Sequence, residues 1–272
     1  MKLRVRAPAT SANLGSGFDF AGVAFELWNE MEVEDDPDAV VDEEHLAVQA
    51  FSLYASPKGR SFSFVDRIPR ERGLGSSAAV VALGLVGGAL AAGLEPEPVQ
   101  LLATGLALEG HADNLAAALA GGVCFTWDGR IARLADRLPA EAIAVIPQNR
   151  VRTAESRGTL PRELSHADAV FSATRAALLG AAVAGGSAEL LAASADDRLH
   201  EPYRLVHAPH LQALRDDLPD GALGATLSGS GPTVIVWAER ARVADVAFAL
   251  EERFPDHDVM HLPVTSTGAG PL

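Results

Sequence analysis

The sequence predicts an α+β protein in two parts, and three observations support this fold class. Short runs alternate polar and apolar residues with the period of half-buried strands, and longer apolar stretches end at glycine or proline as helices do. These segments follow one another without a regular strand–helix–strand repeat, which favours α+β over a doubly wound sheet. A chain of 272 residues suffices for two domains. The proline-bounded region 139–147 is the best boundary, giving parts 1–142 and 143–272.

Four strands are predicted in the first part. Residues 2–6 (KLRVR), 28–34 (WNEMEVE) and 61–65 (SFSFV) alternate polar and apolar side chains. The fourth strand covers 122–127, because it leads into the Asp-Gly pair at 128–129, a dipeptide typical of tight turns.

Three helices are predicted between the third and fourth strands. The first follows a glycine- and serine-rich turn at 73–77 and runs to about residue 90, where a glycine and two prolines end it. The second covers about 99–108, and the third begins near Asp113 and ends at the glycine pair 121–122.

The second part is predicted to begin with a short buried strand, AIAVIP, that a proline closes. The segment GATLSGSGPTVIVWA predicts a strand, a glycine turn and a strand, and HDVMHLPV predicts a last strand. The helices expected in this part cover about 165–184, 187–196, 209–217 and 242–253.

The charge balance argues against two classes of partner. The formal net charge of −14 repels phosphate backbones and anionic headgroups, so we expect neither nucleic-acid nor membrane binding. The ten acids between Glu26 and Glu44 are interpreted as a solvated face rather than a cation site. The single cysteine, Cys124, excludes a disulfide framework and is interpreted as a small buried hydrophobe.

The uncharged stretch 73–94 is long enough to cross a bilayer. Its six glycines and its lack of aromatic anchors instead favour a helix packed closely inside the protein. The N-terminus, MKLRVRAPAT, has no apolar leader, so we expect a cytoplasmic protein.

The segment PRERGLGSSAA at 69–79 is the most informative about function. Glycines let a backbone approach a ligand closely, and the free amides at the start of the following helix favour an anion. We therefore expect a phosphate to approach the backbone at Gly75. The segment lacks the lysine of a Walker A loop. From spacing alone, a phosphate site and a simple turn before a buried helix remain equally compatible.

Three motifs together resemble those of the GHMP kinases. GLGSSAA resembles their phosphate loop, APATSANLGSGFD at 7–19 their N-terminal substrate motif, and LSGSGPT at 227–233 their C-terminal glycine loop. The N-terminal motif together with EGHADN at 109–114 resembles the homoserine kinases in particular. The resemblance spans nearly the whole chain and implies a two-domain fold of mixed sheets with helices packed on them. It makes 1–142 the ATP-binding domain and 143–272 the C-terminal domain.

The resemblance implies a reaction as well. It is the transfer of the γ-phosphoryl group of ATP, with Mg²⁺, to the side-chain hydroxyl of L-homoserine, which gives O-phospho-L-homoserine for threonine biosynthesis. Another GHMP small-molecule kinase, of the mevalonate or shikimate type, stays open, as does an inactive metabolite sensor. The intact glycine loop favours a kinase. The expected partners are homoserine and ATP, with a homodimer left open.

The resemblance also assigns the nucleotide and metal residues. Ser77 and Glu109 would hold the Mg²⁺, although the helix before Glu109 is shorter here than in some relatives. His111 has no second His or Cys at ligand spacing, which argues against zinc. The implied nucleotide-binding residues are Pro69, Arg70, Glu71, Arg72, Gly73, Leu74, Gly75, Ser76, Ser77, Ala78 and Ala79.

Six residues match the substrate site of the family: Asn13, Asp19, His111, Asn114, Arg157 and Arg204. The two arginines would bind the carboxylate, because guanidinium groups bind carboxylates bidentately. The aspartate would bind the ammonium group, and the other three would hold the hydroxyl. By residue type alone, turn formation by Asn13 and Asp19 stays open, as does helix capping by Asp113 or Asn114, of which Asp113 is favoured.

Overall fold

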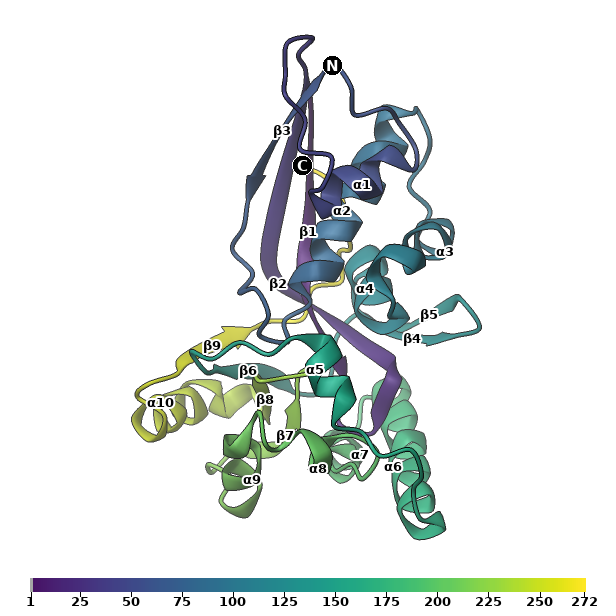
Figure 1. Cartoon of the computed structure of the whole chain (residues 1–272). Helices are drawn as coiled ribbons and strands as arrows, with labels where there is room; N and C mark the ends of the chain where they lie inside the picture. The colour runs from purple at the N-terminus through teal and green to yellow at the C-terminus, as the bar shows by residue number, and fades with distance from the viewer. Residues whose placement is uncertain (1) are drawn as a thin grey trace.

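The computed structural model describes residues 2–272 and has two antiparallel sheets with helices packed on them (Figure 1). This arrangement confirms the α+β class. The first sheet has the strand order β10–β1–β2–β4–β5, and β3 pairs with β2. Its strands are β1 Lys2–Asn13, β2 Gly17–Asp35, β3 Arg60–Val65, β4 Val123–Trp127, β5 Arg130–Ala135 and β10 Gly270–Pro271.

Four helices lie with the first sheet: α1 Leu46–Ser52, α2 Ser76–Ala91, α3 Pro98–Glu109 and α4 Ala112–Ala120. Helix α2 is buried along nearly its whole length, so the uncharged stretch is a core helix, as predicted. Its glycines allow α1 to pack against it directly. A Cβ at Gly84 would lie 2.1 Å from the carbonyl oxygen of Ala47.

The second sheet has the order β7–β8–β6–β9. Its strands are β6 Glu141–Ile146, β7 Ala222–Leu227, β8 Val234–Ala238 and β9 Asp258–Leu262. Its helices are α5 Thr153–Gly158, α6 His166–Gly185, α7 Ala188–Ser194, α8 Glu201–Arg204, α9 Pro209–Asp216 and α10 Val243–Arg253, with a 3₁₀ turn at Arg240–Arg242. Most of these elements match the predicted ranges within a few residues.

Helix α6 alone among the described residues has the length and hydropathy of a membrane span. Only 22% of that stretch is buried. A single such helix is weak evidence for a membrane protein, and α6 packs here against α7 through Leu179, Ala182 and Val183.

The first two strands are much longer than predicted. Beyond residue 6, β1 continues through seven more residues, APATSAN, of which all are buried. A strand that is buried on both faces shows no polar–apolar alternation, so its pattern is not visible in the sequence. The long β1–β2 hairpin therefore extends from the first sheet into the second half of the molecule, where Gly15 lies against Ala195 and Thr226 (Figure 1).

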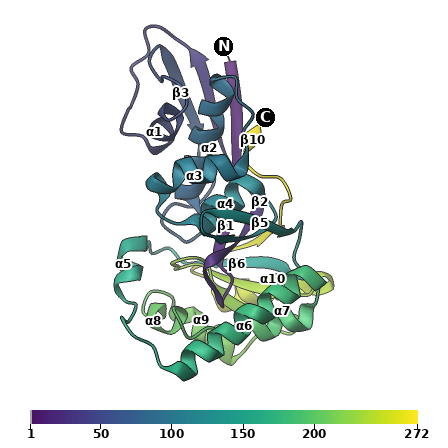
Figure 2. The ribbon, with the colours of Figure 1, turned by 90° about the vertical axis from the view of Figure 1, so that its right-hand side faces the viewer.

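The predicted boundary between residues 142 and 143 cuts through β6, which begins at Glu141. The end of the chain also crosses back to the first sheet. Val264 forms a bridge with Phe25, and β10 pairs with β1, so the C-terminal segment lies beside the first strand (Figure 2). The division into two domains stays a prediction, and the C-terminal segment packs with the first sheet.

Candidate functional site

Six segments that are far apart in the sequence meet between the two halves of the molecule. They are the β1–β2 hairpin, the loop before α2, the junction of α3 and α4, helix α5, helix α8 and the turn between β7 and β8. Two adjoining cavities lie among them, one beside the loop before α2 and a smaller one beside the hairpin. The cavities share five lining residues: Glu109, Asn114, Thr153, Gly229 and Ser230.

The loop before α2 turns its backbone toward the larger cavity. Gly73 and Gly75 have φ angles of 82° and 64°, and Gly75 is the N-cap of the helix. The amides of the first helical turn, beginning at Ser76, have no carbonyl partner within the helix. Together with the positive end of the helix dipole, they form a suitable site for a phosphate.

The glycines let the loop pack closely against its neighbours. A Cβ at Gly75 would lie 1.8 Å from Oγ1 of Thr10, and a Cβ at Gly73 would lie 2.3 Å from the carbonyl oxygen of Ser228. A side chain at Gly75 would therefore meet β1 first. The approach of a phosphate to the Gly75 backbone, which lines the larger cavity, stays a prediction.

Only part of the predicted nucleotide loop faces this cavity. Glu71, Arg72, Gly73, Gly75, Ser76 and Ser77 line it. Leu74, Ala78 and Ala79 are buried behind it in the core. Arg70 forms an ion pair with Asp66 and lines a neighbouring, largely apolar cleft with Leu46 and Val80.

Ser77 and Glu109 lie side by side at one end of the larger cavity. The Ser77 hydroxyl donates to Oε2 of Glu109 at 2.7 Å. Burial raises the pKa of Glu109 to about 7, and the hydrogen bond from Ser77 opposes part of this rise. A hydroxyl and a carboxylate are the oxygen donors that Mg²⁺ prefers, so the pair fits that ion. No three His, Cys, Asp or Glu side chains within residues 2–272 gather as a metal site.

The smaller cavity contains an ion pair between two predicted substrate residues. Nη2 of Arg157 contacts Oδ1 of Asp19, and its Nε donates to Nε2 of His111 at 3.1 Å. Burial, reinforced by the positive charge of Arg157, lowers the pKa of His111, so this imidazole is a neutral acceptor. The structure thus brings together residues from three separate parts of the chain.

Asn13 and Arg204 are bound to the backbone around the same cavity. The Asn13 side chain donates to the carbonyl oxygen of Gly229 at 2.9 Å and accepts from the amide of Asp19 at 3.1 Å. Nη1 of Arg204 donates to the same Gly229 oxygen at 3.2 Å. Asn13 therefore fixes the hairpin to the glycine turn, and its predicted contact with a substrate hydroxyl stays a prediction.

Two residues of the site were not found from the sequence. Asp113 is not the N-cap of α4, which is His111; it lines the smaller cavity, where it accepts from the backbone amide of Asn114 at 2.6 Å. Burial raises the pKa of Asp113 to about 6. Thr10 donates to Oδ1 of Asn114 at 2.7 Å and so fixes the orientation of that amide. Thr10 and Asp113 both lie within the motifs quoted above. Those motifs were the signal in the sequence that could have identified them as site residues.

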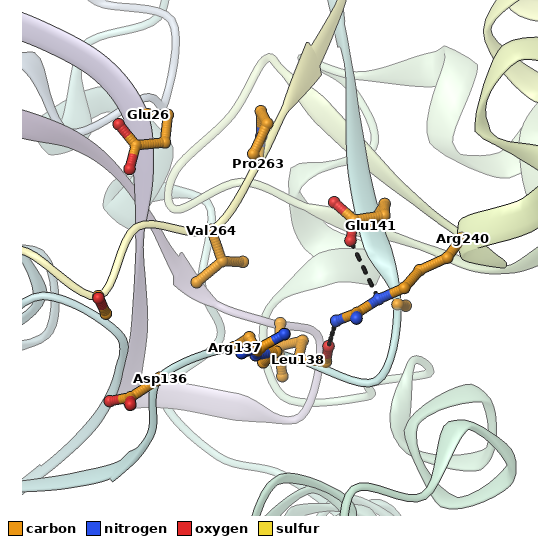
Figure 3. Close-up of a pocket in the computed structure, with 10 residues that line it drawn as sticks. Glu26, Asp136, Arg137, Leu138, Glu141, Arg240, Pro263 and Val264 are labelled. Atoms are coloured by element: carbon orange, nitrogen blue, oxygen red, sulfur yellow. Dashed lines mark hydrogen bonds and ion pairs between the residues drawn. The ribbon is translucent and has the colours of Figure 1, made fainter.

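Another cavity lies at the seam between the two halves, away from all of these residues (Figure 3). Its walls include the two connections between the halves, with Arg137 on one and Val264 on the other. Arg240 forms an ion pair there with Glu141 at 3.2 Å. None of the predicted site residues lines it.

Comparison with known proteins agrees with this geometry. The family model for the GHMP kinases N terminal domain matches residues 43–122, and the model for GHMP kinases C terminal matches residues 176–256. Homoserine kinase from Streptomyces avermitilis is 38% identical, and the match covers 90% of this chain and 88% of that protein. Homoserine kinase from Moorella thermoacetica is 38% identical, with 92% of each chain covered.

The crystal structure of homoserine kinase from Cytophaga hutchinsonii superposes with a TM-score of 0.88 at 25% identity. The superposition covers 100% of this chain and 97% of that one.

Proposed function

The chain belongs to the GHMP kinases and within them to the homoserine kinases, and we propose that it transfers the γ-phosphoryl group of ATP to the side-chain hydroxyl of L-homoserine. The observation that carries this proposal is one cleft in which an anion-binding helix start adjoins a pocket with a paired arginine and aspartate. The product is O-phospho-L-homoserine, an intermediate of threonine biosynthesis, and we place the reaction in the cytoplasm.

The smaller cavity suits a zwitterion. Homoserine carries a carboxylate for Arg157 and Arg204 and an ammonium group for Asp19. When homoserine enters between Arg157 and Asp19, its carboxylate becomes the partner of Arg157 and its ammonium group becomes the partner of Asp19. Neither side chain is then left without an opposite charge in this partly buried site. Mevalonate and shikimate carry a carboxylate but no ammonium group, so they would leave Asp19 without a cation. This difference favours homoserine.

The larger cavity suits the ATP phosphates. Ser76 and Ser77, at the start of α2, line it, and Arg72 and Arg152 add positive charge to its wall. The neighbouring cleft, with Leu46 and Val80, is apolar and borders the same serines, so it can accept the base. We therefore place ATP across the start of α2, with its γ-phosphate toward the smaller cavity.

Mg²⁺ belongs to this proposal because Ser77 and Glu109 fit it. Ser77 would supply a hydroxyl oxygen and Glu109 a carboxylate oxygen. When bound, the ion neutralises charge on the phosphate oxygens. The chain's own contribution is to hold Glu109 in a half-buried position, where its carboxyl loses a proton near neutral pH.

Positioning supplies most of the catalysis in this proposal. The amide of Asn114 cannot accept a proton, and its oxygen already accepts from Thr10. Asp19 is held by Arg157, which suits it to bind substrate rather than to act as a base. A loose phosphoryl-transfer transition state asks little of the nucleophile, so the hydroxyl loses its proton late, to the phosphoryl group itself. The protein orients the hydroxyl and excludes water.

Release of ADP with a panel of alcohols tests the proposal. We expect turnover with L-homoserine and, because it lacks the ammonium group, poor turnover with 4-hydroxybutanoate. The expected difference in kcat/KM is at least about tenfold, as for the loss of one charged hydrogen bond. Faster turnover of mevalonate or shikimate would overturn the substrate and leave the kinase. Absence of ADP release with every alcohol, in a folded protein that binds ATP, would instead indicate a sensor.

A further inference from the structure

His200 lies behind the smaller cavity. It belongs to none of the quoted motifs and has no part in the proposed reaction. Its side chain is fully buried at the N-cap of α8, one helical turn before Arg204. Nε2 of His200 lies 2.9 Å from the carbonyl oxygen of Gly15, at the tip of the β1–β2 hairpin. Its Nδ1 lies 3.0 Å from Nη1 of Arg204. The imidazole therefore connects the hairpin to a predicted substrate arginine.

These two partners determine where the proton of His200 is. A carbonyl oxygen can only accept, so Nε2 must carry a hydrogen and donate it to Gly15. A guanidinium can only donate, so Nδ1 must be free of hydrogen and accept from Arg204. Only the neutral tautomer with its proton on Nε2 satisfies both contacts. Burial supports this state, because it lowers the pKa of His200 to about 4.

The contact with His200 also determines which edge of Arg204 is free. Within residues 2–272, every hydrogen bond of this side chain involves Nη1, which donates to His200 and to Gly229. Nε is buried and has no hydrogen-bond partner. With Nη1 occupied, the edge formed by Nε and Nη2 remains for a ligand. That edge offers two parallel donors, which is the geometry for a bidentate carboxylate.

We propose that His200 is a positioning residue that, as a neutral acceptor, holds Nη1 of Arg204 so that the Nε–Nη2 edge meets the substrate carboxylate. The proposal rests on the proposed function, because it assigns the carboxylate of the substrate to Arg204. His200 does not touch the substrate. It acts through Arg204 and sets the affinity for the carboxylate end of the molecule.

The surroundings of His200 hold its ring still. Oδ2 of Asp197 accepts hydrogen bonds from the backbone amides of Leu199, His200 and Glu201, and these bonds fix the N-terminus of α8. The ring stacks on Phe18 with 4.8 Å between ring centroids. The guanidinium carbon of Arg204 lies 5.3 Å from the same Phe18 ring. The imidazole, the aromatic ring and the guanidinium thus form one packed group at the back of the cavity.

Two substitutions separate the two contacts of His200. In H200N the amide oxygen occupies the place of Nδ1 and can still accept from Arg204, but the contact with Gly15 is lost. In H200Q the longer amide occupies the place of Nε2 and can still donate to Gly15, but the acceptor for Arg204 is lost. Both variants remove the ring stacked on Phe18, so each is the packing control for the other.

We expect H200Q to raise the KM for homoserine at least about tenfold over H200N, the value of one hydrogen bond to a charged group. The kcat and the KM for ATP should agree between the two variants. Phosphorylation of 3-aminopropan-1-ol, which lacks the carboxylate, should also be equal in both. Equal KM values for homoserine in the two variants, or a parallel loss on the amino alcohol, would overturn the proposal. R204A is the control for the proposed function: an unchanged KM in R204A contradicts the carboxylate assignment itself.

A nitrogen-detected NMR spectrum of the histidine side chains supplies a readout that needs no substrate. We expect the His200 ring to show a protonated Nε2 and an unprotonated Nδ1 at neutral pH. R204A should leave Nε2 protonated and shift the Nδ1 resonance, because it removes the donor to Nδ1. An imidazolium, the opposite tautomer, or an Nδ1 resonance that R204A does not move would overturn the inference even if homoserine is not the substrate.

Discussion

Arg157 and Asp19 hold each other across the smaller cavity, so a ligand that uses either side chain must replace an existing ion pair. The exchange costs little when the ligand brings both charges. A simple carboxylate gains less, because it would leave Asp19 without its cation. On the proposed function, selectivity for an amino acid would follow from this ion pair.

The role of Asp19 predicts a particular kinetic pattern for D19N. On the proposal that Asp19 binds the ammonium group and is not the base, we expect the KM for homoserine to rise about tenfold or more in D19N, with kcat falling by a smaller factor. Steady-state kinetics over a range of homoserine concentrations measures both constants. A drop in kcat of about 10²-fold or greater, with KM unchanged, would instead identify Asp19 as a general base. D113N removes another carboxylate of the smaller cavity and is the matched control in the same assay.

Glu109 predicts a pH dependence of stability with an unusual sign. Its pKa is about 7 in the folded protein against the ordinary 4.5, so the folded state holds the extra proton between these values. The contribution of Glu109 to the free energy of unfolding is therefore highest below pH 4.5, and it falls as the pH rises toward 7. We expect metal-free E109Q, which cannot ionise, to be more stable than wild type at pH 8 by on the order of 2 kcal/mol.

Urea unfolding at pH 4 and pH 8 measures this difference, which should nearly vanish at the lower pH, below the ordinary pKa of 4.5. A less stable E109Q at pH 8 would contradict the assignment of a raised pKa. The same variant should show weakened activity at limiting Mg²⁺ that additional Mg²⁺ partly restores. Wild-type activity under that condition would mean that another group holds the metal.

At the scale of elements, the loop before α2 depends on β1. Gly75 packs against Thr10, whose amide donates to the carbonyl oxygen of Leu74 at 3.1 Å and whose hydroxyl fixes Asn114. One strand residue thus positions both the phosphate loop and a side chain of the reaction site. The long hairpin places its tip in the second half while its base remains in the first sheet.

This packing predicts a non-additive pair of substitutions. G75A should destabilise the protein by several kcal/mol, because its Cβ meets Thr10 and its φ of 64° is unfavourable for alanine. T10A should leave the fold nearly intact but lower kcat, because the Asn114 amide loses its partner. In the double variant, part of the G75A cost should disappear, which urea denaturation can measure. Strictly additive free energies would contradict a direct contact between the two positions.

The register of β1 and β2 is matched by charge. Lys2 lies opposite Glu34 and Arg4 opposite Glu32, and ion pairs connect these strands. In the acidic run, Glu30, Glu32 and Glu34 form surface ion pairs with cations of β1 and with Arg67, which agrees with the expected solvated face. We expect E32K to cost about 1 kcal/mol, as like charges do across a strand pair. The double variant R4E/E32K should recover most of this loss, and an unaltered E32K would contradict it.

At the scale of the whole molecule, the end of the chain completes the first half. The amide of Thr265 donates to Ala24, that of Ala269 donates to Ala118 at the end of α4, and β10 pairs with β1. Helix α4 carries Asp113 and Asn114 at its other end, so the last residues support the reaction site from behind. A division of the chain at residue 142 would place these last residues in the second part and their partners, Ala24, Ala118 and β1, in the first part.

Removal of residues 264–272 tests this arrangement. We expect the truncated protein to melt at least several degrees lower, since even 1–2 kcal/mol lowers the Tm of a chain of this size by roughly 2–8 °C. Activity should fall with it, because α4 loses the backbone partner of Ala118. Differential scanning calorimetry and the ADP assay measure both effects. An unchanged Tm would show that the C-terminal segment adds nothing to the first sheet.

The sequence by itself determined those features that depend on neighbouring residues. Alternation in 61–65 and the apolar helix after residue 76 were visible because side chains a few positions apart share a face. The glycine and serine composition of the loop was compatible with an anion site at a helix start and with a simple turn. The quoted motifs pointed to the family and to the residue types of the site.

Only the tertiary structure decided which of these residues meet. Arg157 and Asp19 are 138 positions apart, and Thr10 and Asn114 are 104 apart, so no local period relates them. Strand β1, buried on both faces near the tip of the hairpin, gave no alternation that could have revealed its length. That packing explains why a glycine stands at position 75 and why Asp113 lies in the smaller cavity. It also explains why the C-terminal segment lies beside the first sheet. The physical reason is that each depends on contacts between distant segments, which the fold creates and the local sequence pattern does not encode.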